Sequence, residues 1–153
     1  MIITHQGGES FKISQGDLTL AINPASKVSA DVTLFSSVPQ ETSEKSGFVI
    51  TGPGEYEVKD IFIKGFLAQG KDRLNTIYLI TFEGMKLCFL GSLATPEIKS
   101  ETSEAIEDID ILFPDAKNVT SQPDLISRRS EWVAGVIDGA KHSPFARIKS
   151  TAA

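Results

Sequence analysis

The chain has 153 residues, of which 41% are hydrophobic, and this is long enough to bury one core of its own. A formal net charge of -5 argues against a nucleic-acid-binding protein, because such a protein needs a basic face for the phosphates. No run of about 18 apolar residues occurs, and no basic start precedes an apolar stretch, so neither a membrane span nor a signal peptide is indicated. We therefore expect a cytoplasmic protein that binds neither nucleic acid nor membrane.

Short β-rich runs separated by turn residues dominate the first part of the chain, at residues 11–14, 18–22, 31–35, 47–50, 61–67, 76–82 and 86–90. Gly16 and the pair Glu83-Gly84 fall between neighbouring runs, where glycine supplies the positive φ of a tight hairpin. The last two runs are apolar on both alternating faces, which predicts strands covered on both sides. Cys88, the only cysteine, lies in the last run and is interpreted as a core residue.

Two helices and one further strand are predicted after these runs. Thr95 and Pro96 form an N-cap and first-turn pair that opens a helix ending at Ile106. Residues 109–113 are typical of a buried strand. Residues 123–137 are predicted to be helical, because their apolar side chains repeat at helical intervals, namely Leu125, Ile126, Trp132, Val133, Val136 and Ile137.

No periodic pattern continues beyond Gly139, which can end the second helix. We therefore expect a single domain over residues 1–138 and a loosely ordered tail over residues 139–153. The order of many strands, helix, strand and helix favours a layered α/β, or α+β, sheet-and-helix fold.

Four stretches carry a resemblance to a known family. Residues 52–58 read Gly-Pro-Gly-Glu-Tyr-Glu-Val and give the most specific match; residues 11–24 and 30–34 are similar to an opening hairpin and to a strand that enters a metal loop. Residues 75–93 are similar to paired strands that end in Leu-Gly-Asp-Leu. Over residues 1–114 the chain thus resembles the metallo-β-lactamase-fold hydrolases, in particular a lactonase-like branch of zinc-dependent hydrolases.

The resemblance implies a fold built from an αβ/βα sandwich, in which two sheets are each flanked by helices. Complete members of the family are longer and end on a strand that carries a last histidine ligand. Here the region after Phe113 offers one predicted helix and His142, which lies in no obvious strand. The resemblance therefore implies mainly the N-terminal half of the sandwich, with a shortened or missing second half.

The positions that correspond to the family's metal ligands carry other residue types in this chain. By resemblance, the ligands of the first loop correspond to Ser37, Pro39, Glu41 and Thr42, the bridging aspartate corresponds to Ser92, and a further histidine falls near Gln69 and Gly70. Zinc in hydrolases is held by imidazole and carboxylate groups, and the chain has only two histidines, His5 and His142. We therefore expect no metal and no other cofactor, and we interpret these positions as the remains of a site.

The densest local set of functional groups is Glu55, Tyr56 and Glu57. Alternate residues of a strand point to opposite faces, so the two carboxylates share one face and the phenol lies on the other. A solvated strand edge is the favoured interpretation, and an edge that contacts a ligand is the alternative. No Gly-x-Ser-x-Gly motif and no phosphate-binding glycine-rich loop occurs.

Three hypotheses follow from these patterns. The first is a catalytically inactive, metal-free binding or assembly module, in which a second copy of the chain or a protein partner completes the sandwich. The second is a hydrolase with a rebuilt site that uses Glu41, Ser92 and Glu55. The third is a truncation or frameshift product, because the resemblance fades after residue 114.

Overall fold

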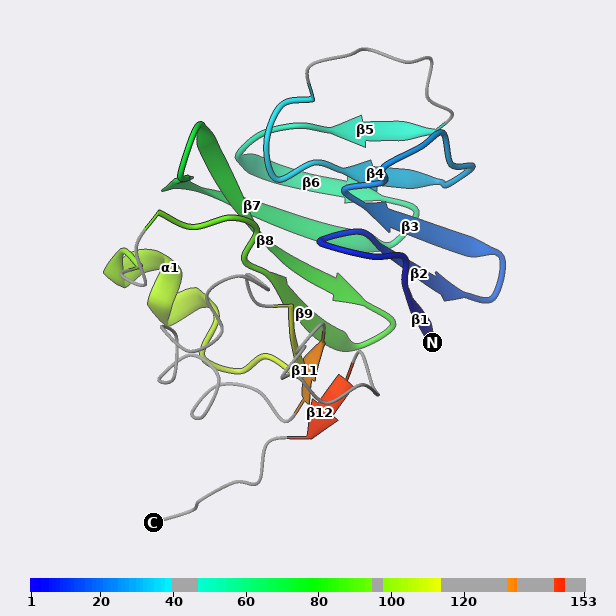
Figure 1. The fold of residues 1–153 in the computed structure, drawn as a ribbon. Helices are drawn as coiled ribbons and strands as arrows, with labels where there is room; N and C mark the ends of the chain where they lie inside the picture. The colour runs from blue at the N-terminus through cyan, green and yellow to red at the C-terminus, as the bar shows by residue number, and fades with distance from the viewer. Residues whose placement is uncertain (40–46, 95–97, 114–131, 135–144, 148–153) are drawn as a thin grey trace.

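The computed structural model describes residues 1–39, 47–94, 98–113, 132–134 and 145–147, and two β-sheets lie face to face in it (Figure 1). The first sheet has five strands in sequential order: β1 (Ile2–His5), β2 (Phe11–Gln15), β3 (Leu18–Ile22), β4 (Val32–Leu34) and β5 (Phe48–Ile50). Strands β1 to β3 are antiparallel, whereas β4 is parallel to both β3 and β5.

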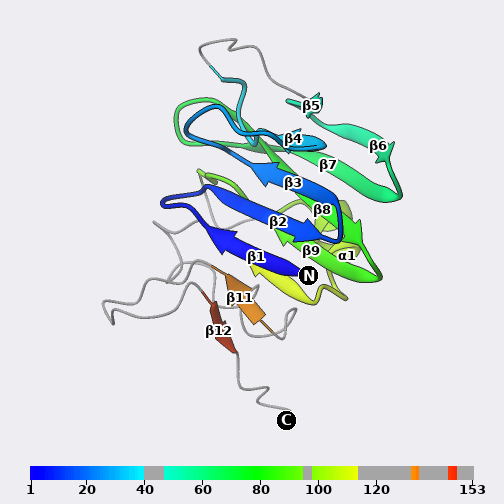
Figure 2. The same cartoon turned by 90° about the vertical axis from the view of Figure 1, so that its right-hand side faces the viewer.

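The second sheet has seven strands, in the spatial order β12 (Phe145–Arg147), β11 (Trp132–Ala134), β10 (Ile111–Phe113), β9 (Met85–Phe89), β8 (Leu74–Phe82), β7 (Ile61–Gln69) and β6 (Gly54–Val58). Strands β6 to β9 form an antiparallel meander, and β10 is parallel to both β9 and β11. Helix α1 (Ser100–Ala105) lies on the face of this sheet that is turned away from the first sheet (Figures 1 and 2). The predicted layered sheet-and-helix fold, a partial sandwich, is confirmed.

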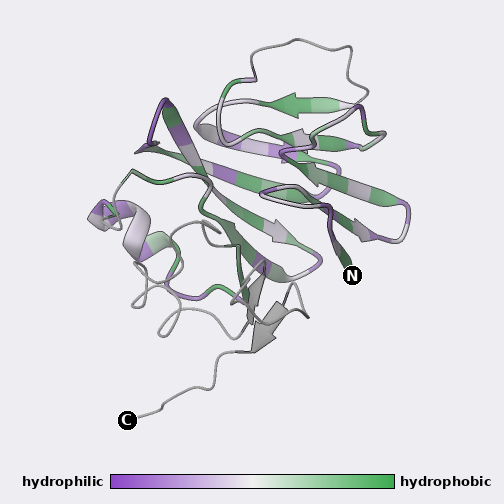
Figure 3. Ribbon diagram, in the orientation of Figure 1, coloured by the Kyte–Doolittle hydropathy of each residue, from purple (hydrophilic) through white to green (hydrophobic). Residues whose placement is uncertain are grey.

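Two apolar clusters lie on the two faces of the second sheet. Tyr78, Ile80 and Phe89 belong to the cluster between the sheets, and Ile77 and Cys88 belong to the cluster under α1. The strands that the sequence predicted to be covered on both sides are therefore covered on both sides, and Cys88 is buried in the core. Burial of an isoleucine or phenylalanine side chain, such as Ile80 or Phe89, contributes roughly 1.5–3 kcal/mol of transfer free energy. In Figure 3 hydrophobic residues alternate with hydrophilic ones along the strands, and hydrophilic residues mark the β7–β8 turn and α1.

Both predicted hairpin turns are present. Glu83 and Gly84 join β8 to β9 with φ values of 52° and 74°, and Gly16 at 56° joins β2 to β3. The positive φ at both Glu83 and Gly84 is the geometry of the type I′ turn, whose twist matches that of the flanking strands.

The structure corrects both predicted helices. Helix α1 begins at Ser100 with Lys99 as its N-cap residue, later than predicted, and Thr95 and Pro96 lie outside the described residues. The helix predicted over residues 123–137 is wrong at Trp132–Ala134, which form strand β11 beside β10. Tryptophan and valine favour strands, and pairing with a buried parallel neighbour outweighs the helical spacing of the apolar residues.

The structure also adds a strand that the sequence pattern did not predict. Strand β12 lies in the stretch predicted to be a loose tail and pairs antiparallel with β11. No helix in the described parts of the chain is long and apolar enough to cross a membrane.

Candidate functional site

The loop after β4 is held from one side by Asn23. The Asn23 side chain accepts a hydrogen bond from the Ser36 amide at 3.0 Å and donates one to Ser36 Oγ at 2.9 Å. Asn23 has a φ of 45°, a conformation that asparagine tolerates better than most residues. Its backbone amide donates a hydrogen bond to the Leu34 carbonyl. The polar groups of Ser36 are therefore bound by protein.

The start of β8 holds the same loop from the other side. The Thr76 amide donates to the Ser36 carbonyl at 2.7 Å, and Ser37 Oγ donates to the Leu74 carbonyl at 3.2 Å. The Tyr78 hydroxyl donates to the buried Phe35 carbonyl at 2.7 Å. Burial raises the pKa of the Tyr78 phenol, so this hydroxyl remains a donor at any ordinary pH.

Asn75 links this loop to the segment after β9. Its side chain is fully buried; Nδ2 donates to the Leu90 carbonyl at 2.8 Å, and Oδ1 accepts from the Ser92 amide at 3.2 Å. Gly91 between them has a φ of 67°, and a Cβ there would collide with Asn75 Oδ1 and lie 2.9 Å from Ser36 Cβ. The backbone of Gly91 thus packs directly against Ser36 and Asn75.

The three segments that the family resemblance assigned to metal binding therefore do meet. Ser37 and Ser92 both contact the start of β8, and the Ala94 amide donates to the Gln69 carbonyl at 2.9 Å. A Cβ on Gly70 would lie 3.2 Å from the Ser92 carbonyl oxygen. Pro39 is partly buried at the end of the loop, and Glu41 and Thr42 lie outside the described residues.

The groups gathered here do not fit zinc, because they are hydroxyls, amides and carbonyls that already hydrogen-bond to one another. No cluster of three or more His, Cys, Asp or Glu side chains occurs among the described residues. His5 lies in β1, where its ring stacks on Phe11 at 4.8 Å and Nε2 hydrogen-bonds to the Gly8 carbonyl at 2.9 Å. His142 lies outside the described residues.

The Glu55-Tyr56-Glu57 segment forms the edge strand β6. Tyr56 packs against the core between the sheets, and its hydroxyl lies 3.1 Å from both the Gly52 and the Pro53 carbonyl oxygens. Both glutamates are exposed, and Glu55 pairs with Lys64 at 3.4 Å. Among the described residues Glu55 pairs with Lys64 and the Ser92 amide bonds to Asn75, and Glu41, the third residue of the alternative hydrolase site, lies outside them.

A second polar cluster ties the β6–β7 turn to the first sheet. Asp31 Oδ2 accepts a hydrogen bond from the Thr19 amide at 2.9 Å, and Asp31 Oδ1 pairs with Lys59. The hydrogen bond from Lys59, with the amide of Thr19 second, lowers the pKa of the Asp31 carboxyl. The adjoining cavity of about 440 Å³ bears both acidic and basic groups, and the paired charges indicate a structural connection.

Sequence reasoning missed the two asparagines that organise the loop. The family that the chain resembles usually has Ile-Asp-Pro where this chain has Ile22-Asn23-Pro24, and this difference was the available signal. Asn75 opens an apolar strand, where a buried polar side chain needs a partner, but the sequence does not say which backbone groups it meets.

Comparison with known proteins identifies the family of the fold. The model of the β-lactamase superfamily domain matches residues 2–133, which extends the resemblance beyond residue 114. The structure is similar to that of a Thermotoga maritima protein assigned to the Zn-dependent hydrolases of the metallo-β-lactamase superfamily. Identity is 26% and the TM-score is 0.68, over 84% of this chain and 71% of that protein.

Two further solved structures share the fold at low identity. The metallo-β-lactamase fold protein YhfI from Bacillus subtilis is 10% identical, with a TM-score of 0.51 over 68% of this chain and 61% of that one. A mutant of the β-hydroxylase CmlA is 12% identical, with a TM-score of 0.55 over 79% of this chain and 37% of that one. None of the curated proteins matches the sequence.

Proposed function

Because this chain belongs to the β-lactamase superfamily but shows no cluster of zinc-holding side chains among its described residues, we propose that it is a catalytically inactive, metal-free member that serves as a binding or assembly module. The observation that carries the proposal is the set of hydrogen bonds made by the buried side chain of Asn75. Asn75 satisfies the Leu90 carbonyl and the Ser92 amide in the segment where the family's bridging aspartate would stand. A buried amide that is already paired gives up those bonds only at a cost of about 1–3 kcal/mol, so these hydrogen bonds disfavour conversion to a metal site.

The inactive half of the proposal is tested by thermal unfolding with stoichiometric and excess zinc or manganese. A metal present at 100 times its Kd stabilises a folded protein by about 2.7 kcal/mol, which raises Tm by several degrees. We expect no rise in Tm. His5→Ala, which removes the imidazole that the structure describes, is the matched control and is expected to respond like the parent chain. A clear rise in the parent chain would contradict the metal-free proposal.

The assembly half of the proposal is supported by exposed apolar side chains near the loop that follows β4. Val38 and Leu74 are 65% and 60% exposed, and their segments are joined by the hydrogen bonds from Arg73 to the Val38 carbonyl and from Ser37 to the Leu74 carbonyl. Adjoining exposed apolar groups are typical of a surface that meets another protein. A second copy of the chain, or a protein partner, would cover them.

Light scattering on the purified chain tests this part. We expect a homodimer or larger assembly that Leu74→Gln weakens and Ile2→Gln, an exposed residue of β1, leaves intact. A monomer at all concentrations would contradict self-assembly.

A further inference from the structure

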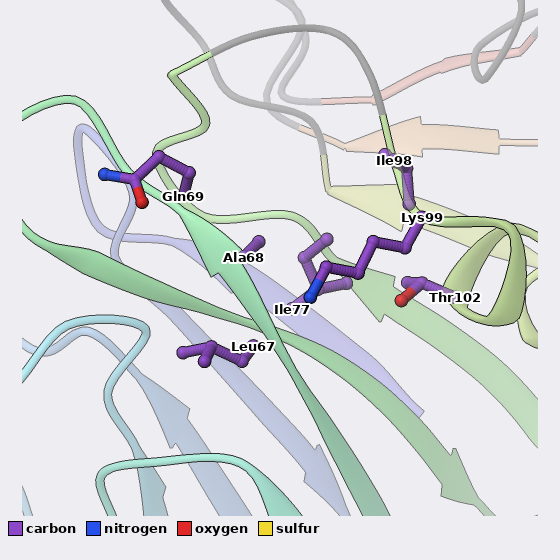
Figure 4. A pocket seen from close by; sticks show the side chains of 7 residues that line it. All are labelled: Leu67, Ala68, Gln69, Ile77, Ile98, Lys99 and Thr102. Carbon is purple, nitrogen blue, oxygen red and sulfur yellow. The ribbon is translucent and has the colours of Figure 1, made fainter.

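A groove lies between the outer face of the second sheet and the start of α1. Its floor is Ala68 and Ile77, and its other lining residues are Leu67, Gln69, Ile98, Lys99 and Thr102, around a volume of about 300 Å³ (Figure 4). A second cavity of about 350 Å³ adjoins it and shares Leu67, Lys99 and Thr102. Pockets of this size, with an apolar floor and a few polar groups, are typical of sites for small molecules.

Thr102 supplies a buried polar group that has no partner among the described residues. Its side chain belongs to α1, only 4% of the residue is exposed, and its hydroxyl has no hydrogen-bond partner in the described part of the chain. In Figure 4 the hydroxyl oxygen points from the helix towards Lys99 and Ile77. Most buried polar side chains are hydrogen-bonded, so an unpaired hydroxyl that lines a cavity indicates a group that is bound there.

Lys99 supplies a positive charge above the apolar floor. In Figure 4 its side chain extends over Ile77, and neither of the two ion pairs found among the described residues involves Lys99. Lys64, which lines the adjoining cavity, differs because Glu55 lies 3.4 Å away and the Phe66 ring lies 5.2 Å away. The charge in the groove therefore comes from Lys99, in a chain whose net charge is -5.

We infer that this groove binds a small organic acid, with the apolar part of the ligand on Ala68 and Ile77 and the carboxylate between the Lys99 ammonium and the Thr102 hydroxyl. A carboxylate accepts hydrogen bonds from both donors, and such charge-assisted bonds are stronger than neutral ones. The apolar floor excludes a ligand that is ionic throughout. The inference goes beyond the proposed function and does not depend on whether the Ser37 and Ser92 region binds metal.

The experiment is an NMR titration of the ¹⁵N-labelled full chain with sodium hexanoate, alongside hexylamine and 1-hexanol. Hexanoate is expected to give saturable shifts of the Leu67, Ile77 and Thr102 amides, and hexylamine is expected to give none. Hexanol should bind more weakly than hexanoate, because it cannot form the ion pair.

Two variants test the residues assigned to the carboxylate. Lys99→Gln and Thr102→Val are each expected to raise the Kd for hexanoate about tenfold, since each removes a hydrogen bond to a charged group. Thr33→Val, which removes a buried hydroxyl of β4, and Lys12→Gln, on β2, are the matched controls and should leave the Kd unchanged. Lys99 is exposed, so its variant tests the site even if Thr102→Val does not fold.

Several results would overturn the inference. They are the absence of saturable shifts with hexanoate, an unchanged Kd in Lys99→Gln, and equal binding of hexylamine. A pentapeptide with a free C-terminal leucine distinguishes the other source of a carboxylate. Tighter binding of that peptide than of hexanoate, with shifts that reach Gly54 and Glu55, would replace the small acid by a peptide terminus.

Discussion

Two polar regions adjoin the first half of β8, and they differ in how their polar groups are satisfied. In the loop region, defined by residues 35–37, 75 and 90–92, the side chains of Asn75 and Ser36 are hydrogen-bonded to protein. In the groove of Figure 4, the hydroxyl of Thr102 and the ammonium of Lys99 have no partner among the residues that the structure describes. The comparison teaches that, in this member of the β-lactamase superfamily, the polar groups of the loop region are satisfied by protein, whereas the groove holds polar groups without a described partner.

The largest effect is expected where the loop region is most tightly packed. Gly91→Ala combines a left-handed φ with a collision against Asn75, so we expect unfolding free energy to fall by about 3 kcal/mol or more. Gly84→Ala is the matched control, because its φ is similarly positive but nothing lies within 4 Å, and it should cost about 1 kcal/mol. Urea unfolding measures both, and equal losses would break the claim that the loop region is closely packed.

A smaller effect is expected from the tyrosine that holds the loop. Tyr78→Phe leaves the buried Phe35 carbonyl without its donor and should cost about 1–2 kcal/mol. Tyr56→Phe deletes the same group from a partly exposed site where water can replace the bond, so it should cost less than about 1 kcal/mol. A larger loss for Tyr56→Phe in urea unfolding would contradict this ranking.

The Asp31–Lys59 pair adds a third polar cluster to the comparison. Its groups are charged and, as in the loop region, they are paired within the protein. The folded-state pKa of Asp31 lies below its ordinary value of 3.8, so its stabilisation is present above that value and is lost as pH falls through the folded pKa. Asp31→Asn should therefore flatten the decline of Tm between about pH 5 and pH 2. Lys59→Met, which removes the partner, should flatten it as well. An unchanged decline in both variants would remove the pair as a source of acid sensitivity.

The smallest effect on stability is expected in the groove. Thr102→Val replaces a buried hydroxyl that has no described partner by a methyl group of similar size, so the free energy of unfolding should stay the same or rise by up to about 1 kcal/mol. A loss of more than about 1 kcal/mol in urea unfolding would show that the hydroxyl is bonded within the protein. The groove would then resemble the loop region, and the comparison would fail.

The sequence predicted the strands of the two sheets up to β10 better than helix α1 and the last two strands, β11 and β12. The strand at Leu18–Ile22 and the turn at Glu83-Gly84 were predicted because local alternation and turn chemistry agree with the tertiary structure. Trp132–Ala134 were mistaken for helix, since a short apolar run fits both periods and only the neighbouring strand β10 decides between them.

The candidate sites were predicted unevenly for a similar reason. The meeting of Ser37 and Ser92 was predictable, because a resemblance to a family carries its topology. The partners of Asn75 depend on backbone groups 15 and 17 residues away, and the groove depends on how Lys99 and Thr102 lie over Ile77. No local pattern encodes these contacts.

The central claim, that the loop region is a structural connection and holds no metal, is tested most directly by the metal-to-protein ratio. The measurement is mass-spectrometric metal analysis of the full chain, produced in zinc-supplemented medium and dialysed without chelator. We predict a zinc content far below one ion per chain, in both the parent chain and His5→Ala. One zinc or manganese ion per chain in both proteins would contradict the account.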